Sequence, residues 1–130
     1  MEPISLYKFG GSEEVLRRIQ APLVRFFRGY APVLDIGCGR GVFLGLLSGA
    51  GIASIGIDHS EEALAACRAK GLSVHRQDGR DYLGQNHGKF GGIFCSHVIE
   101  HMAYDDAIIF LNLCRGALRH NGIILLITPN

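Results

Sequence analysis

Apolar residues along this chain fall into two patterns, short continuous runs and longer stretches in which they recur every three or four positions. The short runs predict strands and the periodic stretches predict helices. The runs predict five strands, at residues 32–36, 53–58, 72–76, 92–97 and 123–128. The fifth run has no polar alternation, so we expect helices to cover both of its faces.

Four helices are predicted around these strands. The first begins after Ser12, a common N-cap residue, and Pro22 is expected to kink it before it ends near Gly29. The second helix is expected at residues 41–49. The sheet-facing side of the first helix is predicted to carry Val15, Ile19, Leu23 and Phe27.

Capping and turn residues mark the rest of the chain. The third helix is predicted to start at the cap residue Ser60 and to close at Lys70-Gly71. Residues 77–81 are expected to form a polar turn, and residues 84–89 a loop. The fourth helix is predicted to end at Asn121-Gly122. Its core face is predicted to carry Ala107, Phe110, Leu111, Cys114 and Leu118.

The alternation of strands and helices predicts an α/β fold. We expect a Rossmann-like, doubly wound, mainly parallel sheet with helices on both faces. The 130 residues suffice for one domain, 1–130, in which residues 1–11 form an N-terminal arm. A hydrophobic content of 48% with 18 glycines fits such a glycine-punctuated layer protein.

Composition excludes several classes of function. A net charge of +1 provides no field that would attract nucleic acid, and four arginines, Arg17, Arg18, Arg25 and Arg28, are spread around one helix. The four cysteines form no C-x-x-C pair, so we expect reduced thiols, no metal site and a cytoplasmic location. No apolar run approaches the ~20 residues that a membrane span requires.

The most informative stretch reads VLDIGCGRG at residues 33–41. A strand that breaks into glycines before a helix brings bare backbone against a nucleotide-like ligand. A dinucleotide fingerprint requires glycine at its sixth position, where this chain has Val42. Asp35 lies two residues before Gly37, where it would repel a pyrophosphate and attract an ammonium or sulfonium group. Charge therefore favours S-adenosylmethionine over NAD as the ligand.

Polar residues follow several of the predicted strands. Because parallel strands end at one edge of a sheet, Asp35, Asp58, Asp78 and His97 are expected to converge. Asp58 could accept both hydroxyls of a ribose, or it could only support the start of the third helix. Asp78 could accept the amine of adenine, or it could bond its own backbone in a turn.

In order and spacing, residues 33–44, 55–58, 77–79 and 92–102 resemble the successive motifs of class I S-adenosylmethionine-dependent methyltransferases. In finer detail the chain resembles methyltransferases associated with bacterial polysaccharides, including O-antigen chain-terminating ones. That likeness lies in the segments GCGRG, CRAKGL, GGIF, VIEH and TPN. The Glu100-His101 pair is also similar to that of ubiquinone-type small-molecule O-methyltransferases, so the acceptor stays open. Residues 7–12 resemble the family's entry segment, which implies a cover for the donor.

The resemblance implies a role for each motif residue. The methionine end of the donor would be held by Asp35, Gly37, Cys38, Gly39 and Gly41. Asp58 would hold the ribose, with His59 beside it at the surface, while Asp78 and Gly79 would border the adenine. His97 would face the donor near its methionine tail, and Glu100 and His101 would lie towards the acceptor. His97 and His101 are the candidate catalytic bases, although either histidine could be structural.

The reaction so implied is in-line transfer of a methyl group to an oxygen of a saccharide or small molecule. The alternative is a regulatory or partner module that binds the donor without turnover. An oxidoreductase is disfavoured by Asp35 and Val42. Because such methyltransferases usually continue past strand five, we expect this chain to be C-terminally truncated or to self-associate through that strand.

Overall fold

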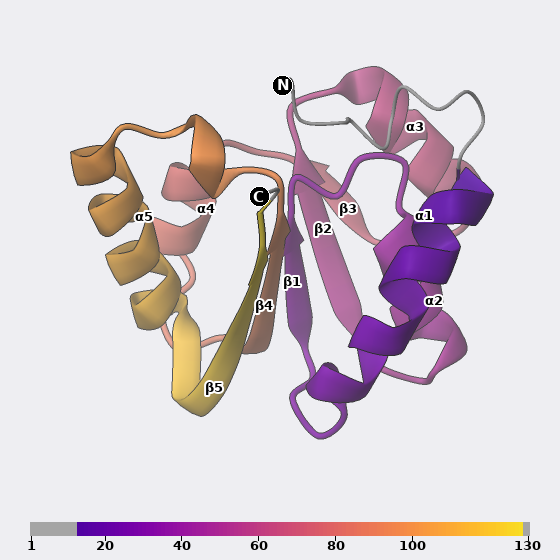
Figure 1. The fold of residues 1–130 in the computed structure, drawn as a ribbon, viewed down its shortest axis with the longest axis horizontal. Helices are drawn as coiled ribbons and strands as arrows, with labels where there is room; N and C mark the ends of the chain where they lie inside the picture. Colours follow the sequence, from indigo (N-terminus) through magenta and orange to yellow (C-terminus); the bar gives the residue numbers. More distant parts are fainter. Residues whose placement is uncertain (1–12, 129–130) are drawn as a thin grey trace.

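The fold is a parallel sheet between two layers of helices (Figure 1). The computed structural model describes residues 13–128, so the predicted arm at 1–11 and the cap Ser12 lie outside the described residues. The strands are β1 (Val33–Ile36), β2 (Ser54–Asp58), β3 (Val74–Arg76), β4 (Phe90–Ser96) and β5 (Leu118–Ile127). They pair in the order β3-β2-β1-β4-β5, and every pairing is parallel. The predicted Rossmann-like α/β class is confirmed.

Helices cover both faces of this sheet. One face carries α1 (Glu13–Gln20), the 3₁₀ helix η2 (Ala21–Phe27), α2 (Val42–Gly49) and α3 (Glu61–Ala69). The other face carries α4 (Gly79–Gly84) and α5 (Tyr104–Ala117), with the short 3₁₀ turn η3 (Ile99–His101) between β4 and α5. The chain changes its direction of winding between β1 and β4, so ligands of such sheets bind above the ends of these central strands.

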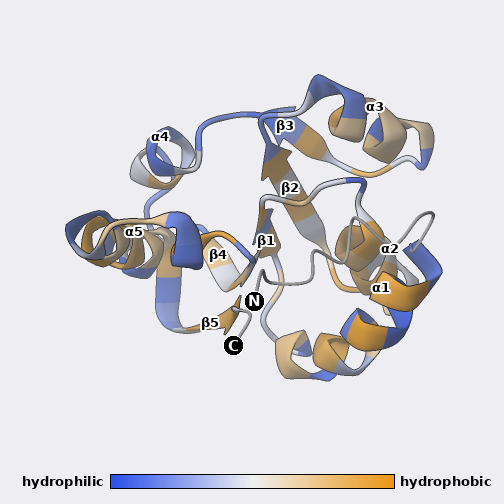
Figure 2. Ribbon diagram, turned by 45° about the horizontal axis from the view of Figure 1, so that its top comes forward, coloured by the Kyte–Doolittle hydropathy of each residue, from blue (hydrophilic) through white to orange (hydrophobic). Residues whose placement is uncertain are grey.

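Alternate residues of each strand enter the two cores. Val33 of β1 packs with Phe27, Phe43 and Phe94, whose rings form a compact cluster in which Phe43 and Phe94 stack with centroids 3.9 Å apart. Leu34 faces the opposite core under α4 and α5. The residues of β5 also divide between the two cores, as predicted for a strand with cover on both faces. Figure 2 shows the resulting hydrophobic colour along the strands.

The predicted sheet-facing side of the first helix is partly wrong. Val15 and Ile19 are 44% and 47% exposed, and Leu16, Gln20 and Val24 are buried instead. Phe27 is buried as predicted, and Leu23 is partly buried against the same core. Pro22 has no N–H for an α-helical bond, and the chain continues from Ala21 as a 3₁₀ helix rather than as a kinked α-helix. In the tighter 3₁₀ helix the buried residues Val24 and Phe27 are three positions apart instead of four, which changes which residues of the segment face the sheet.

Helix α4 was not predicted, because residues 77–81 were interpreted as a turn and 84–89 as a loop. Asp78 caps this helix, since its Oδ1 accepts a hydrogen bond from the N–H of Arg80 at 2.9 Å. Tyr82 and Leu83 are the buried residues of this helix. Around it, β3 begins two residues later and β4 two residues earlier than predicted.

The fourth predicted helix is too long at its end. Helix α5 stops at Ala117, and Leu118, predicted on its core face, is the first residue of β5. The guanidinium of Arg119 donates hydrogen bonds to the carbonyls of Gly29 and Ala31, at 3.0 and 2.9 Å, which hold this segment extended. Phe110 and Cys114 are buried as predicted. The start of α3 is also confirmed, because the Ser60 hydroxyl accepts from the Ala63 N–H.

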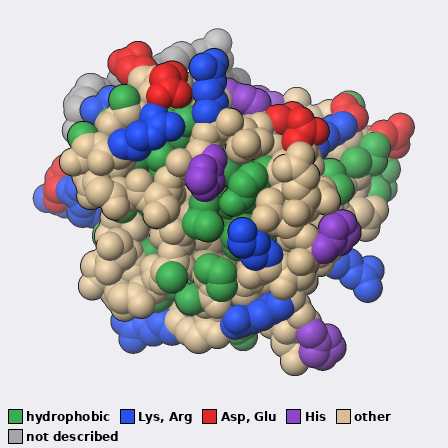
Figure 3. All heavy atoms as spheres, turned by 180° about the vertical axis from the view of Figure 1, so that it is seen from behind, with side chains coloured by type: hydrophobic (Ala, Val, Ile, Leu, Met, Phe, Trp, Pro, Cys, Tyr) green, Lys and Arg blue, Asp and Glu red, His purple; other side chains and the backbone are tan. Residues whose placement is uncertain are grey.

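Residues 13–128 contain no helix with the length and apolar character needed to cross a bilayer. The four cysteines are unpaired and buried. Figure 3 shows the face opposite to that of Figure 1, where Asp and Glu side chains lie along the upper part and the left rim, and Lys, Arg and His side chains are scattered over the rest.

Candidate functional site

The glycine loop after β1 is a tight turn at the switch point of the sheet. Gly37, Gly39 and Gly41 have φ values of 75°, 57° and 87°, a region that side chains disfavour. The N–H groups of Gly37 and Cys38 both donate to the carbonyl of Ile57, at 2.9 and 3.0 Å. The turn is closed by a 3.1 Å bond from the Gly41 N–H to the Cys38 carbonyl. The loop is thereby anchored to β2.

Asp58, at the end of β2, supports this loop and the following helix with a single carboxylate. Its Oδ2 accepts from the N–H of Gly39 at 2.8 Å, and its Oδ1 accepts from the N–H of Ser60 at 2.9 Å. The helix-supporting role that the sequence left as an alternative is therefore present. Each carboxylate oxygen has a further lone pair, so both can still accept from a ligand.

Asp35 is a buried carboxyl inside β1, with an exposed fraction of only 3%. Burial raises its pKa from the ordinary 3.8 to about 8, with a smaller contribution from the negative charge of Asp58. The group therefore carries a proton at neutral pH. A cation placed beside Asp35 would favour its ionised form.

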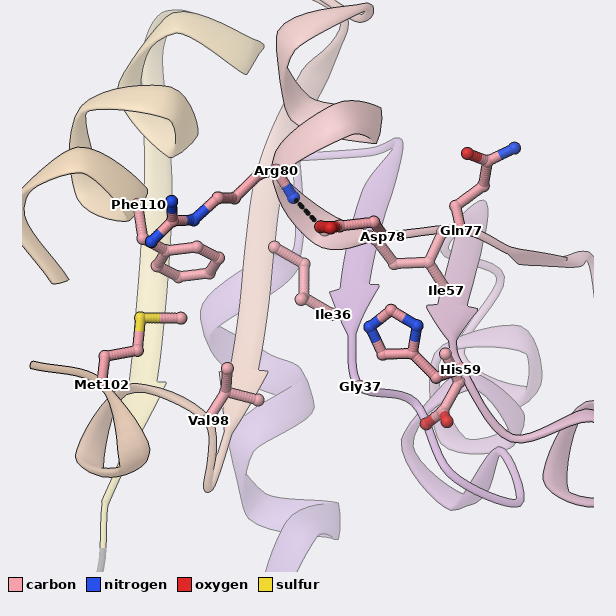
Figure 4. A pocket seen from close by; sticks show the side chains of 12 residues that line it. Ile36, Gly37, Ile57, His59, Gln77, Asp78, Arg80, Val98, Met102 and Phe110 are labelled. Atoms are coloured by element: carbon pink, nitrogen blue, oxygen red, sulfur yellow. Dashed lines mark hydrogen bonds between the residues drawn. The ribbon is translucent and has the colours of Figure 1, made fainter. Parts of the chain in front are cut away.

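A cavity of about 240 Å³ opens beside the loop, between the ends of β1, β2 and β3 on one side and η3 and α5 on the other (Figure 4). Its walls are mainly apolar, formed by Ile36, Ile57, Val98, Met102 and Phe110. Its polar groups come from Asp58, His59, Gln77, Asp78 and Arg80, and Gly37 and Gly79 complete the lining. Apolar walls with a few polar groups at the rim suit a small organic molecule that bears polar substituents.

The far end of this cavity is built on the start of α4. Asp78 uses its Oδ1 for the helix cap, as the structural alternative from the sequence predicted, and its second oxygen accepts no hydrogen bond from residues 13–128. Arg80 crosses to α5 and forms an ion pair with Asp106 at 3.0 Å. A Cβ on Gly79 would lie 3.6 Å from Ile36 and 3.9 Å from Phe110, so space remains at this position.

His97, Glu100 and His101 form a group after β4. Nδ1 of His97 and Nε2 of His101 lie 3.7 and 3.5 Å from the Glu100 carboxylate. The side chain of His97 is 25% exposed and that of His101 is 74% exposed. His97 has a φ of 60°, unusual for a residue with a side chain, and its N–H donates to the Ile127 carbonyl at 2.8 Å.

The structure brings together some of the predicted site residues. The cavity is lined by Gly37, Asp58, His59, Asp78 and Gly79. It does not include Asp35, Cys38, Gly39 and Gly41, which lie in β1 and the loop, or His97 and His101, which follow β4. No three His, Cys, Asp or Glu side chains are arranged to hold a metal ion within residues 13–128.

Sequence reasoning missed seven lining residues: Ile36, Ile57, Gln77, Arg80, Val98, Met102 and Phe110. Phe110 was assigned to the core, and an apolar wall of a cavity has the same sequence pattern as a core position. Arg80 could have been found, because an aspartate cap followed by the apolar pair Tyr82-Leu83 is a signal for a short helix.

Residues 33–122 match the family described as a methyltransferase domain. The chain belongs to the methyltransferase domain family. Ubiquinone biosynthesis O-methyltransferases from Aromatoleum aromaticum and Glaesserella parasuis are 30% and 32% identical to it over 104 and 108 residues. These matches cover 75% of this methyltransferase domain and 44% and 45% of the two relatives, so the chain spans less than half of their length.

Solved structures share the fold of this methyltransferase domain. A SAM-dependent methyltransferase from Archaeoglobus fulgidus superimposes with a TM-score of 0.79 at 35% identity, covering 88% of this chain and 52% of that one. PH0226 from Pyrococcus horikoshii gives a TM-score of 0.75 at 22% identity, over 95% of this chain and 62% of that one. These relatives do not support the likeness to polysaccharide-associated methyltransferases, which stays a prediction.

Proposed function

We propose that this chain is the S-adenosylmethionine-binding part of a methyltransferase. The observation that carries the proposal is the Asp58 carboxylate, which is bonded to the glycine loop and lines the mainly apolar cavity that Asp78 also lines. Membership of the methyltransferase domain family and 35% identity to a SAM-dependent methyltransferase support it.

In the proposed complex the donor lies across the switch point of the sheet. The adenine occupies the apolar cavity, where its amine donates to the second oxygen of Asp78 and Gly79 leaves space at its edge. The ribose hydroxyls donate to the remaining lone pairs of Asp58. The methionine end lies along the glycine loop, where Asp35 ionises in response to the cationic donor.

The proposed reaction is in-line displacement at the sulfonium methyl carbon. The bond from an acceptor oxygen to the methyl carbon forms as the carbon–sulfur bond breaks, and the sulfur keeps the electron pair of that bond. The acceptor's proton passes to a base, for which His97 is favoured over the more exposed His101. Holding oxygen and methyl in line supplies most of the rate.

The acceptor is proposed to be an oxygen on a small molecule or a saccharide. The names of the relatives, ubiquinone biosynthesis O-methyltransferases, favour a small molecule. The VIEH segment of the polysaccharide likeness contributes only Val98 to the cavity. Methyl transfer to a panel of phenols and sugars distinguishes the two acceptor classes.

The alternative is a donor-binding module without turnover, and the observation in its favour is that neither candidate base, His97 or His101, lines the described cavity. Calorimetric titration with S-adenosylmethionine, S-adenosylhomocysteine and NADH tests the donor site. We expect the first two to bind and NADH not to bind. Binding of NADH in preference to S-adenosylmethionine would overturn the proposed function, whereas donor binding without transfer to any acceptor favours the module.

A further inference from the structure

The C-terminal turn of α3 packs directly behind the glycine loop. A Cβ on Gly41 would come within 2.9 Å of the Cys67 sulfur and 2.6 Å of a methyl carbon of Leu72. Cys67 is fully buried. Because these groups are in close contact, the position of the loop depends on the position of this turn.

Two consecutive carbonyls of the loop accept hydrogen bonds from this turn. The Cys67 thiol donates to the Gly39 carbonyl with a sulfur–oxygen distance of 3.2 Å, and Nζ of Lys70 donates to the Arg40 carbonyl at 3.0 Å. The Cys38 thiol approaches the same Gly39 oxygen at 3.7 Å. Burial raises the pKa of the Cys67 thiol, so its proton stays on the sulfur and remains available for donation.

Holding these carbonyls also fixes the N–H groups of the same peptide units. In a planar trans peptide the C=O and the N–H point in opposite directions. With the Gly39 carbonyl directed at α3, the N–H of Arg40 points away from α3. The Gly41 N–H already donates to the Cys38 carbonyl within the turn, whereas the Arg40 N–H donates to no residue between 13 and 128. Within the described residues, the Arg40 N–H is thus available to donate to a ligand.

An ion-pair network extends this support to the first helix. The Glu13 carboxylate accepts from Nε of Arg40 at 2.9 Å and lies 3.4 Å from Nζ of Lys70. The hydrogen bond from Arg40, with the charge of Lys70, lowers the pKa of Glu13. Lys70 thus contacts both the backbone of the loop and the start of α1.

We propose that Cys67 and Lys70 are positioning residues that orient the loop peptides so that the Arg40 N–H donates to the bound donor. This inference rests on the proposed function, because it concerns the same donor site. Neither side chain lines the cavity. Both act through the backbone of Gly39 and Arg40, and Glu13 holds the Lys70 ammonium in place.

Lys70 is tested by Lys70→Met, with Lys70→Arg as the conservative variant and Lys89→Met as the control. Lys89 is an exposed lysine just before β4, at the opposite edge of the sheet. We expect Lys70→Met to weaken S-adenosylhomocysteine binding about three- to tenfold in calorimetry, with most of the loss restored in Lys70→Arg. Lys89→Met should bind like the wild type. Equal affinity of Lys70→Met and wild type would overturn the role of Lys70.

Cys67 is tested by Cys67→Ala and Cys67→Ser, with Cys114→Ala as a control for loss of a buried thiol. Cys114 is as buried as Cys67 but lies in α5 on the other face of the sheet. We expect Cys67→Ala to weaken binding about threefold or more, Cys67→Ser to restore it through its hydroxyl donor, and Cys114→Ala to lower stability without changing affinity. Equal losses in Cys67→Ala and Cys67→Ser would show that packing is responsible and would overturn the role.

Amide NMR of the ligand-free protein separates this inference from the proposed function. If the wild type does not bind S-adenosylmethionine, the proposed function fails. The loop geometry is still tested, because Lys70→Met and Cys67→Ala should shift the amide resonances of Arg40 and Gly41, and Lys89→Met should not. Unchanged loop resonances in both variants would overturn the positioning role whatever the ligand.

Discussion

Replacing Asp35 with asparagine should remove a pH dependence of folding stability that this buried carboxyl imposes. Its folded pKa of about 8 lies above the ordinary 3.8, so the folded state binds the proton more tightly than the unfolded chain does. The contribution of Asp35 to the unfolding free energy is fully present below about pH 4 and is lost as the pH rises towards about 8. At ~1.36 kcal/mol per pKa unit, the loss at pH 7 is on the order of 4 kcal/mol.

The assay is urea unfolding followed by circular dichroism, at half-unit steps from about pH 5 to pH 8.5. Over this range the unfolding free energy of the wild type should fall by up to ~1.4 kcal/mol per pH unit relative to Asp35→Asn. The control is Asp81→Asn, which removes an exposed carboxylate of α4 and should run parallel to the wild type. Parallel curves for the wild type and Asp35→Asn would refute the reasoning.

In the proposed complex, the same carboxyl should make the enthalpy of donor binding depend on the buffer. If the cationic donor ionises Asp35, binding at pH 7 releases about one proton to the solution. The calorimetric enthalpy should then vary with the ionisation enthalpy of the buffer in the wild type and not in Asp35→Asn. No buffer dependence in the wild type would show that the cation of the donor does not lie beside Asp35.

Three further predictions concern the site, and a fourth concerns the edge of the sheet. Asp58→Ala should weaken donor binding by roughly 1.5–3 kcal/mol. It should also lower the unfolding free energy by about 1–2 kcal/mol, because the N–H groups of Gly39 and Ser60 lose their acceptor. Unchanged donor affinity in a folded variant would exclude the ribose role. Gly39→Val and Gly41→Ala should abolish donor binding in calorimetry, because the loop needs positive φ at both positions and a Cβ at Gly41 meets Leu72 and Cys67. His97→Ala, in a form of the protein that transfers methyl groups, should lower kcat with little change in donor affinity, and loss of donor affinity would instead assign His97 to the donor site. The outer edge of β5 is unpaired within residues 13–128, so this chain should self-associate in light scattering, and a stable monomer at high concentration with slow amide exchange along residues 123–127 would contradict that expectation.

The elements at the centre of the sheet could be predicted from sequence because local signals and tertiary packing agree there. The strand that begins at Val33 has a continuous apolar pattern, and the turn after it requires glycine for its backbone conformation. The cap of α3 by Ser60 is a local hydrogen bond that does not depend on how the helix packs. The signals were weaker at the ends of the sheet. The length of β5 depends on the hydrogen bonds that Arg119 donates to Ala31 and Gly29. These two residues lie 88 and 90 positions earlier in the chain, so no local sequence window contains the contact.

The candidate site was predictable in part for a similar reason. Asp58 and Asp78 occupy positions fixed by the topology of a parallel sheet, so their convergence follows from the order of the strands. The apolar wall formed by Val98, Met102 and Phe110 depends on how η3 and α5 return over the sheet. Periodicity shows that such residues are buried, but it does not show whether they face other side chains or an open cavity.

The double use of Asp58 has a consequence for comparing related genes. Its carboxylate holds the loop through Gly39 and the start of α3 through Ser60, by hydrogen bonds within the chain. A relative that transferred no methyl group would still be under selection to keep this aspartate, because its fold would be less stable without it. Retention of Asp58 among relatives is therefore evidence of an intact architecture. If the activity is lost in evolution, substitutions should appear first at positions that contact a ligand and have no role in the fold.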